Sequence, residues 1–398
     1  MKRYATTQLE PGMIVGAPIY SNQGQLILEV GTELTDKLIS RLGFYGIYTV
    51  AIQDAPVPEP EPTESLPVFT EEPKPEPKKK SIFAPLPKQK VDPNAEPVPV
   101  TPSAALSHSQ LIRQTPEFRA FQVNYTKEIL TLQSSLSFVL NDSANELDTN
   151  QLVADISDLI GSTKSTMDLF DMLHNMRQID DSIYAHSLNV AMIARTMGKW
   201  LNFTDREMKI ITLCGLLHDL GKTALPIELL TKPGRYTEEE YEAVKQHPML
   251  GYQIIEQQPI DERIKNAVLM HHERCDGSGY PNGLTTEQLD DFSMIIAIAD
   301  VYDAMTAARS YREPLCPFQV IDAFEKEGLQ KYHPKYILTF LENIADTYQH
   351  NKVLLNNGQS ATIVMINKSH LTQPYIQFSD GTTIDMTSRP DLEIVKIL

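Results

Sequence analysis

Residues 271–281 read His-His-Glu-Arg-Cys-Asp-Gly-Ser-Gly-Tyr-Pro. In this stretch two adjacent histidines stand beside acids and a glycine-rich turn, which indicates a metal site next to a ligand-binding loop. Adjacent side chains on a helix point about 100° apart, because the helix has 3.6 residues per turn. His271 and His272 can therefore serve one centre of two ions only if further ligands converge on them from elsewhere in the chain.

Further histidines and aspartates occur in separate segments with helical periodicity. One pair stands in Gly-Leu-Leu-His-Asp-Leu-Gly-Lys, residues 215–222. Another carboxylate, Asp300, ends an apolar run, and a charge on a buried helix face is costly unless it is paired or bound to a metal. Imidazole and carboxylate together suit two divalent ions that share a bridging ligand. The candidates are His186, His218, Asp219, His247 and Asp300.

Composition indicates a soluble globular protein. The chain has 398 residues, of which 41% are hydrophobic and 22% charged. Its formal net charge of −17 argues against binding of a nucleic-acid polymer, although metals and a few basic groups can still create a phosphate site. Three widely spaced cysteines predict reduced thiols, and neither a signal peptide nor a membrane span is expected. We therefore expect a cytoplasmic protein.

Changes in composition divide the chain into four parts. The second part is dense in Pro, Glu and Lys and cannot bury enough apolar area to offset its ordering entropy. The third part shows helical periodicity, and the fourth shows short alternating runs around glycines. We predict a small N-terminal α/β domain over 1–54, a Pro-rich disordered linker over 55–106, a helical domain over 107–350 and a small β-rich segment over 351–398.

Local patterns place elements within these parts. Thr204 with Glu207 predicts a capped helix start, and Thr237 with Glu240 predicts another. A short helix is expected after Thr35. Strands are predicted over 13–20, 25–30 and 47–52 near the N-terminus, and over 352–355, 360–366, 375–378 and 382–386 near the C-terminus.

The region over about 107–350 resembles an HD-GYP domain, the cyclic di-GMP phosphodiesterase branch of the HD hydrolase superfamily. Six motifs match in the same order and at close spacing, and residues 9–13 resemble a small domain often found ahead of HD-GYP domains. The resemblance implies a mainly α fold, with an HD-type all-helical catalytic domain, a small N-terminal α/β domain and a short C-terminal β appendage. The matching stretches are 180–191, 215–222, 232–234, 247–251, 271–281 and 299–306.

The same resemblance implies a dinuclear centre, with iron or manganese in first place and zinc as an alternative. A hydroxide between the ions would hydrolyse cyclic di-GMP to linear pGpG, and a second cut would give GMP; the sequence leaves open which of the two is the end product. Asp219 is both the bridging ligand and a catalytic residue. The implied ligands of the first ion are His186, His218, Asp219 and Asp300. Those of the second ion are Asp219, His247, His271 and His272.

Substrate contacts are also implied by the resemblance. Lys222 matches a catalytic lysine that contacts the substrate phosphate; the alternative is a cap at a helix C-terminus. Arg309 and Arg312 suit bidentate contact with phosphate or guanine, unless they form an exposed basic turn. The remaining implied substrate contacts are Asp303, Gly279 and Tyr280.

Two residues depart from the family pattern. Ser182 stands where some members have a glutamate that helps to hold a third metal, so we expect two ions. Cys275 stands where an aromatic residue is usual, and we interpret it as a small residue that fills a looser loop. Glu273 and Asp276 are expected to orient the adjacent histidines or to cap the loop.

Other functions fit parts of the same pattern. A module that binds a cyclic dinucleotide without cutting it, and signals to a partner protein through the linker, is one alternative. An HD phosphohydrolase that acts on another nucleotide is a second. A homodimer formed through apolar helix faces is compatible with every one of these readings.

Overall fold

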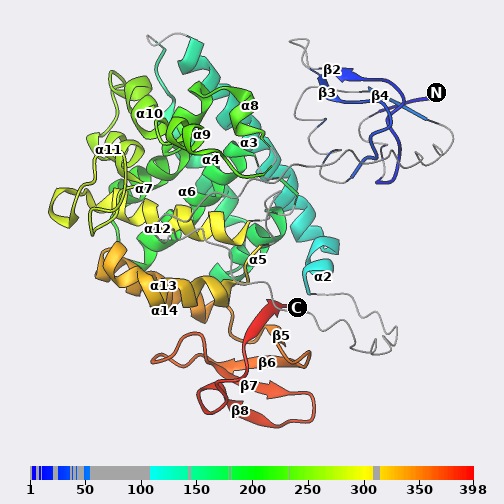
Figure 1. Cartoon of the computed structure of the whole chain (residues 1–398), viewed down its shortest axis with the longest axis vertical. Helices are drawn as coiled ribbons and strands as arrows, with labels where there is room; N and C mark the ends of the chain where they lie inside the picture. Colours follow the sequence, from blue (N-terminus) through cyan, green and yellow to red (C-terminus); the bar gives the residue numbers. More distant parts are fainter. Residues whose placement is uncertain are drawn as a thin grey trace, which may run out of the picture.

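Figure 1 shows the computed structural model of the chain, with a large helical region, a C-terminal sheet and a few N-terminal strands. The predicted linker over 55–106 lies outside the described residues, and so does most of the helix predicted after Thr35. The structure describes residues 2–5, 9, 11–20, 26–35, 38, 42, 49–53, 108–141, 145–177, 179–180, 182–232, 234–307 and 314–398.

The helical region contains the elements that carry the candidate site, and the predicted mainly α fold is confirmed. Among the described residues of this region, the short 3-10 helices η2 (Leu220–Ala224) and η3 (Thr286–Gln288) accompany the α-helices, and η4 (Met386–Ser388) lies in the C-terminal part. The α-helices are α2 (His108–Gln114), α3 (Pro116–Asn141), α4 (Thr149–Gly161), α5 (Thr166–Met176), α6 (Ile183–Trp200), α7 (Asp205–Leu217), α8 (Ile227–Leu230), α9 (Glu238–Val244), α10 (His247–Ile255), α11 (Glu262–Met270), α12 (Asp291–Thr306), α13 (Pro317–Lys331) and α14 (Pro334–Asp346).

Side-chain caps fix where several of these helices begin. The predicted capping boxes are confirmed: Thr204 caps α7 together with Glu207, and Thr237 caps α9 together with Glu240. Ser182 caps α6, since its Oγ accepts a hydrogen bond from the Ala185 amide at 3.1 Å. Each cap sets the phase of a helix, and therefore the direction in which its functional side chains point.

Helix α6 packs against α7 and α12 in the middle of the helical region (Figure 1). The approach of α6 to α7 depends on Gly215, because a Cβ there would lie 2.4 Å from the Ala191 Cα atom. Helix α12 is buried on almost every side from Phe292 to Ala299. The polar side chains of these helices that face inward are consequently surrounded by apolar atoms.

The C-terminal part forms an antiparallel sheet with the strand order β8-β7-β6-β5-β9. Its buried residues Val353, Ile363 and Ile376 belong to the same hydrophobic core as the helices, and β9 contacts α13. The four predicted strands are present, whereas β9 was not predicted. The strands are β5 (Lys352–Leu355), β6 (Ser360–Met365), β7 (Tyr375–Phe378), β8 (Thr383–Asp385) and β9 (Ile394–Ile397).

The N-terminal strands surround a separate small core that includes Val15, Leu34 and Val50. Strand β1 pairs antiparallel with β4, and β2 pairs with β3. Strand β1 was not predicted, because its four residues show no alternation of apolar and polar side chains. The strands are β1 (Lys2–Ala5), β2 (Ile19–Tyr20), β3 (Leu26–Leu28) and β4 (Thr49–Ile52). Among the described helices, none combines the length and apolar character needed to cross a bilayer.

Candidate metal centre

Helix ends and the middle of the helical region bring the seven candidate ligands together. His186 lies in the second turn of α6, and Asp300 lies in α12. The other five lie at or next to helix termini: His218 and Asp219 after α7, His247 at the start of α10, and His271 and His272 after α11. The ligand atoms fall into two groups, and within each group they all lie within 4.8 Å of one another. The first group is His186, His218 and Asp300, and the second group is Asp219, His247, His271 and His272.

In the first group, His186 Nε2 lies 3.0 Å from Asp300 Oδ1. The Nε2 atom of His218 lies 4.0 Å from the same oxygen, is buried, and has no hydrogen-bond partner. A buried nitrogen without a partner is costly unless it binds something. The geometry of this group therefore leaves room for a cation between the two rings and the carboxylate.

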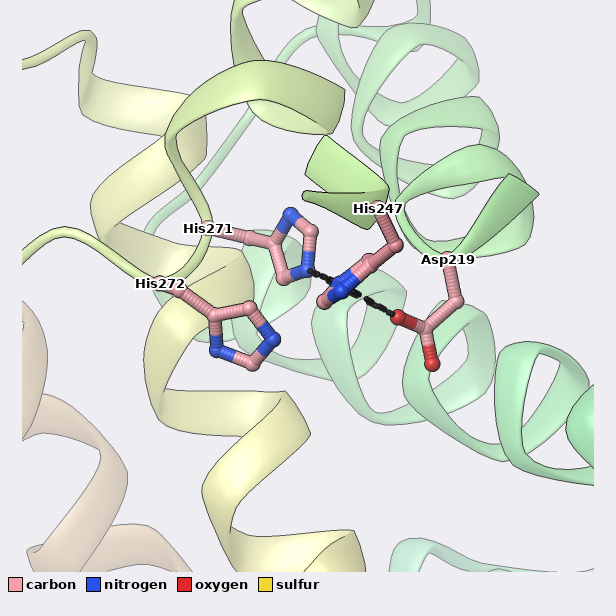
Figure 2. Close-up of side chains that lie close together, drawn as sticks. All are labelled: Asp219, His247, His271 and His272. Carbon is pink, nitrogen blue, oxygen red and sulfur yellow. Dashed lines mark hydrogen bonds and ion pairs between the residues drawn. The ribbon is translucent and has the colours of Figure 1, made fainter. Parts of the chain in front are cut away.

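Figure 2 shows the second group, in which the rings of His271 and His247 point toward the carboxylate of Asp219. The Nε2 atom of His247 lies 3.2 Å from Asp219 Oδ1 and 3.2 Å from His271 Nε2. His271 Nε2 is 3.7 Å from the same carboxylate oxygen. Although His247 is this close, Asp219 Oδ1 has no hydrogen-bond partner of suitable geometry.

Asp219 lies between the two groups and turns one oxygen toward each. Its Oδ1 faces the second group, while its Oδ2 lies 3.6 Å from His186 Nε2 and 3.5 Å from His218 Nε2. The Nζ atom of Lys222 lies 2.5 Å from the same Oδ2 atom. A carboxylate with this orientation can bridge two ions.

Backbone carbonyls fix the tautomers of three histidines. The Nδ1 atoms of His218, His247 and His271 lie 2.8 Å from Gly215 O, 2.7 Å from Val244 O and 2.9 Å from Val268 O. Since a carbonyl oxygen only accepts hydrogen bonds, each Nδ1 carries the proton and each neutral ring presents its Nε2 lone pair to the centre. The lone pairs of His247 and His271 thus face Asp219 Oδ1, and that of His218 faces Asp219 Oδ2. This donor set fits divalent metal ions.

Electrostatics favour the protonation states that metals require at four of the ligands, whereas at His186 burial opposes protonation but the hydrogen bonds and charges of Asp300 and Asp303 raise the pKa to about 9. Burial lowers the pKa of His218 to about 3, and burial also lowers the pKa values of His247 and His272. Burial opposes ionisation of Asp219, but the positive charge of Lys222 holds its pKa well below the ordinary value. Neutral imidazoles around an ionised carboxylate are the ligand forms that bind a cation.

The loop that carries Gly279, Tyr280 and Pro281, here called the GYP loop, packs directly onto the second group. The ring of Tyr280 stacks on that of His272 with the centroids 4.6 Å apart and an interplanar angle of 28°. A Cβ on Gly279 would lie 2.3 Å from the Glu273 Cα atom, so only glycine allows this approach. Gly279 and Tyr280 thus support a candidate ligand, and their expected contact with substrate stays a prediction.

Acidic side chains hold this loop in place. Glu273 accepts hydrogen bonds from the Asn282 amide at 2.7 Å and the Leu284 amide at 3.0 Å. Asp276 accepts one from the Ser278 amide at 3.0 Å. Of the two roles expected for these acids, the structure therefore supports capping of the loop.

Cys275 is half-buried, and its Sγ lies 3.8 Å from Met294 Sδ. Burial raises the pKa of this thiol. The residue belongs to neither ligand group. Its position agrees with the interpretation of a small residue filling the loop.

The predicted substrate contacts have different outcomes. Arg309 and Arg312 lie outside the described residues. Asp303 is only 1% exposed, and its two oxygens lie 2.5 Å from Arg177 Nε and 2.7 Å from His186 Nδ1. A nucleotide cannot reach a carboxylate that is buried behind His186 and already paired. We therefore correct this expectation: Asp303 supports a candidate ligand.

Arg177 is the residue of this site that the sequence did not indicate. It directly follows α5, where a basic residue is ordinarily explained by the helix dipole. In the structure Arg177 is only 4% exposed, and its guanidinium lies over the Tyr302 ring, 5.6 Å from the centroid. No local sequence signal distinguishes such a buried arginine from an exposed one.

Comparison with known proteins agrees with this geometry. Residues 151–336 match the family model described as HD domain. A cyclic di-GMP phosphodiesterase of Thermotoga maritima is 31% identical over 191 residues, which are 47% of this chain and 51% of the relative. The 3'3'-cGAMP-specific phosphodiesterase 1 of Vibrio cholerae is 38% identical over 148 residues, 36% of this chain and 33% of that protein. The chain thus spans about half the length, or less, of these curated relatives.

A solved structure shares the fold. Bd1817, an HDG"Y"P protein from Bdellovibrio bacteriovorus, superimposes with a TM-score of 0.51 at 14% identity, covering 86% of this chain and 99% of that one. The helical region therefore shares its fold with that protein, and residues 151–336 within it match the HD domain family. Together with the match of residues 151–336 to the HD domain family, this likeness confirms the resemblance to HD-GYP domain proteins that was drawn from the sequence.

Proposed function

We propose that this chain is a metal-dependent phosphodiesterase that hydrolyses cyclic di-GMP to linear pGpG and then to GMP. The observation that carries the proposal is the convergence of buried lone pairs on Asp219, with no donor among the atoms that face its Oδ1. Such an arrangement is unfavourable without cations. Relatives named as cyclic dinucleotide phosphodiesterases support the substrate class.

Two divalent ions suit the donor set. Iron or manganese is proposed first and zinc second, because imidazole combined with carboxylate suits all three. When bound, the ions supply Lewis acidity toward the phosphate and an activated water for in-line displacement. One ion would be held by His186, His218 and Asp300, and the other by His247, His271 and His272, with Asp219 shared between them.

Lys222 is proposed to contact a phosphate of the substrate. Its side chain is 23% exposed and starts from the short helix η2, so the ammonium can reach both Asp219 and an approaching anion. As a compact point charge, it would neutralise non-bridging phosphate oxygens without requiring a fixed geometry. Arg309 and Arg312 are retained as proposed nucleotide contacts on the basis of sequence alone.

The decisive experiment loads the protein anaerobically with iron or manganese, measures the metal content, and incubates it separately with cyclic di-GMP and 3'3'-cGAMP. We expect pGpG, followed by GMP, from cyclic di-GMP, at a higher kcat/KM than for the hybrid dinucleotide. His370→Ala is a matched control, because this exposed histidine belongs to neither ligand group. Faster turnover of 3'3'-cGAMP would transfer the assignment to that substrate.

A binding module without catalysis predicts a different result. In that case the metal-loaded protein would form a complex with cyclic di-GMP that persists for hours, and no linear product would appear. Full metal occupancy combined with an intact dinucleotide would therefore contradict the proposed hydrolysis.

A further inference from the structure

One buried ion pair connects the end of α5 to α12. Arg177 Nε lies 2.5 Å from Asp303 Oδ1, although the two residues are 126 positions apart in the chain. Both side chains are almost completely removed from solvent, with 3% and 2% of their surfaces exposed. Burial of two charges carries a large desolvation penalty, so this pair is weak evidence for stability as such. A functional role at the metal centre explains the presence of the Arg177–Asp303 pair better.

The contact made by the second oxygen of Asp303 indicates what this role is. Asp303 Oδ2 lies 2.7 Å from His186 Nδ1, and on the other side of the same ring His186 Nε2 lies 3.0 Å from Asp300 Oδ1. Arg177 donates to one oxygen and thereby holds the carboxylate with its other oxygen facing the imidazole. An ionised carboxylate can only accept, so the ring must place a proton on Nδ1.

His186 differs in this respect from its neighbours. His218, His247 and His271 are each oriented by a backbone carbonyl. No side-chain substitution can remove a carbonyl, whereas the support of His186 comes from one replaceable side chain. We propose that Arg177 and Asp303 are positioning residues that fix the tautomer and orientation of His186, and thereby determine whether the first group holds its ion. This inference rests on the proposed metal centre.

Asp303→Asn is the most informative substitution because it nearly preserves the shape of the side chain. If the amide oxygen accepts from His186, the amide nitrogen faces Arg177, donor against donor. If the amide is reversed, its nitrogen donates to His186 Nδ1, which moves the ring proton to Nε2, where it blocks the metal. Both arrangements disfavour the first ion. The second group is unaffected, because carbonyls orient His247 and His271 and Tyr280 stacks on His272.

The primary measurement is metal content per chain and the affinity of each ion, from competition with a chelator in the absence of substrate. We expect Asp303→Asn to lower the first-ion affinity about 10- to 100-fold, as is usual for partners of ligating histidines, with the second ion retained. In Arg177→Lys the charge remains but the guanidinium geometry is lost, and in Arg177→Met both are lost. We expect first-ion affinity in the order wild type, Arg177→Lys, Arg177→Met.

A spectroscopic readout separates positioning from general destabilisation. With ¹⁵N-labelled histidine, the metal-free wild-type protein should show Nδ1 of His186 protonated, and Asp303→Asn should shift this resonance or average it. Asp290→Asn provides a matched control on the same helix, since Asn caps a helix as well as Asp does. Ile156→Ala lowers stability through the core around α4, at a residue that belongs to neither ligand group, and should keep both ions.

The outcomes separate this inference from the proposed function. A wild-type protein that binds no metal would remove the basis of both. Wild-type metal content with unchanged affinities in Asp303→Asn would overturn the positioning role and leave the phosphodiesterase proposal intact. If Ile156→Ala and Asp303→Asn have the same melting temperature and lose the first ion to the same extent, the positioning role is also overturned, because general destabilisation then explains the loss. Selective loss in Asp303→Asn supports the inference whichever dinucleotide the enzyme cuts.

Discussion

The histidine ligands of the centre are supported in two different ways, and each ligand group contains both kinds. Rings such as His247 and His271 receive their support from carbonyls at or near helix C-termini, where the last carbonyls have no partner within the helix. His186 depends on Asp303 from another helix, and His272 depends on the stacked ring of Tyr280. Local backbone support forms wherever the helix forms. Support from distant side chains requires the complete tertiary structure and can be lost by a single substitution.

The largest expected effect comes from the one ligand that both groups share. Asp219→Ala removes an oxygen from each group, so both ions should be lost. Turnover should fall by more than about 100-fold, because loss of a residue that only hydrogen-bonds to a metal ligand already costs up to about 100-fold. Metal analysis and product formation measure the effect, with the exposed Asp322→Ala as control. Retained activity would remove Asp219 from the bridging position.

Gly279→Ala tests the loop support of the second group. The added Cβ would lie 2.3 Å from a backbone atom of Glu273, so the loop must move away from His272. We expect about 1–3 kcal/mol of destabilisation in urea unfolding, together with a weaker second ion. In Gly161→Ala the added atom meets nothing within 4 Å, so this variant serves as the control. An unchanged second ion in Gly279→Ala would show that the loop does not support His272.

Tyr280→Ala should have a smaller effect on the same ion. The stacked pair with His272 is worth about 0.5–1.5 kcal/mol, which corresponds to about a 2- to 13-fold loss of second-ion affinity. Tyr280→Phe retains the ring and should retain the affinity. If Tyr280→Phe instead raises KM without any change in metal binding, the hydroxyl contacts substrate, as the sequence first suggested.

The smallest effect concerns the start of α11, the helix that leads to both adjacent histidines. Hydrogen bonds from Arg263 lower the pKa of Asp261 to about 2. Because the folded-state pKa lies below the unfolded value, this stabilisation is complete above about pH 4 and is lost as the pH falls toward 2.

Asp261 is close to the surface, so solvent screening limits the effect to about 1 kcal/mol or less. Urea unfolding of metal-free protein between pH 5 and pH 3 should reveal it as a difference between wild type and Asp261→Asn, which keeps the helix cap. If the free energy of unfolding has the same pH dependence in the two proteins, the Asp261 carboxylate does not contribute to stability.

Much of the architecture was predictable because it depends on local patterns. The capping boxes at Thr204 and Thr237 and four C-terminal strands follow from residues that lie close together in the chain. Strands β1 and β9 were missed, since their sequences are short and do not alternate. Each is defined by its pairing with a distant strand, β4 or β5. The pattern of residues within a short window of sequence does not reveal pairing of that kind.

The sequence by itself determined the class of fold, the order of the motifs and the set of seven candidate ligands, because ligand chemistry depends on residue type and spacing. Only the tertiary structure decided what stands behind each ligand. Asp303 was expected beside a nucleotide, yet it lies buried between Arg177 and His186. The physical reason is that a carboxylate's role depends on which groups surround it. Here those groups lie more than 100 residues from Asp303 in the chain.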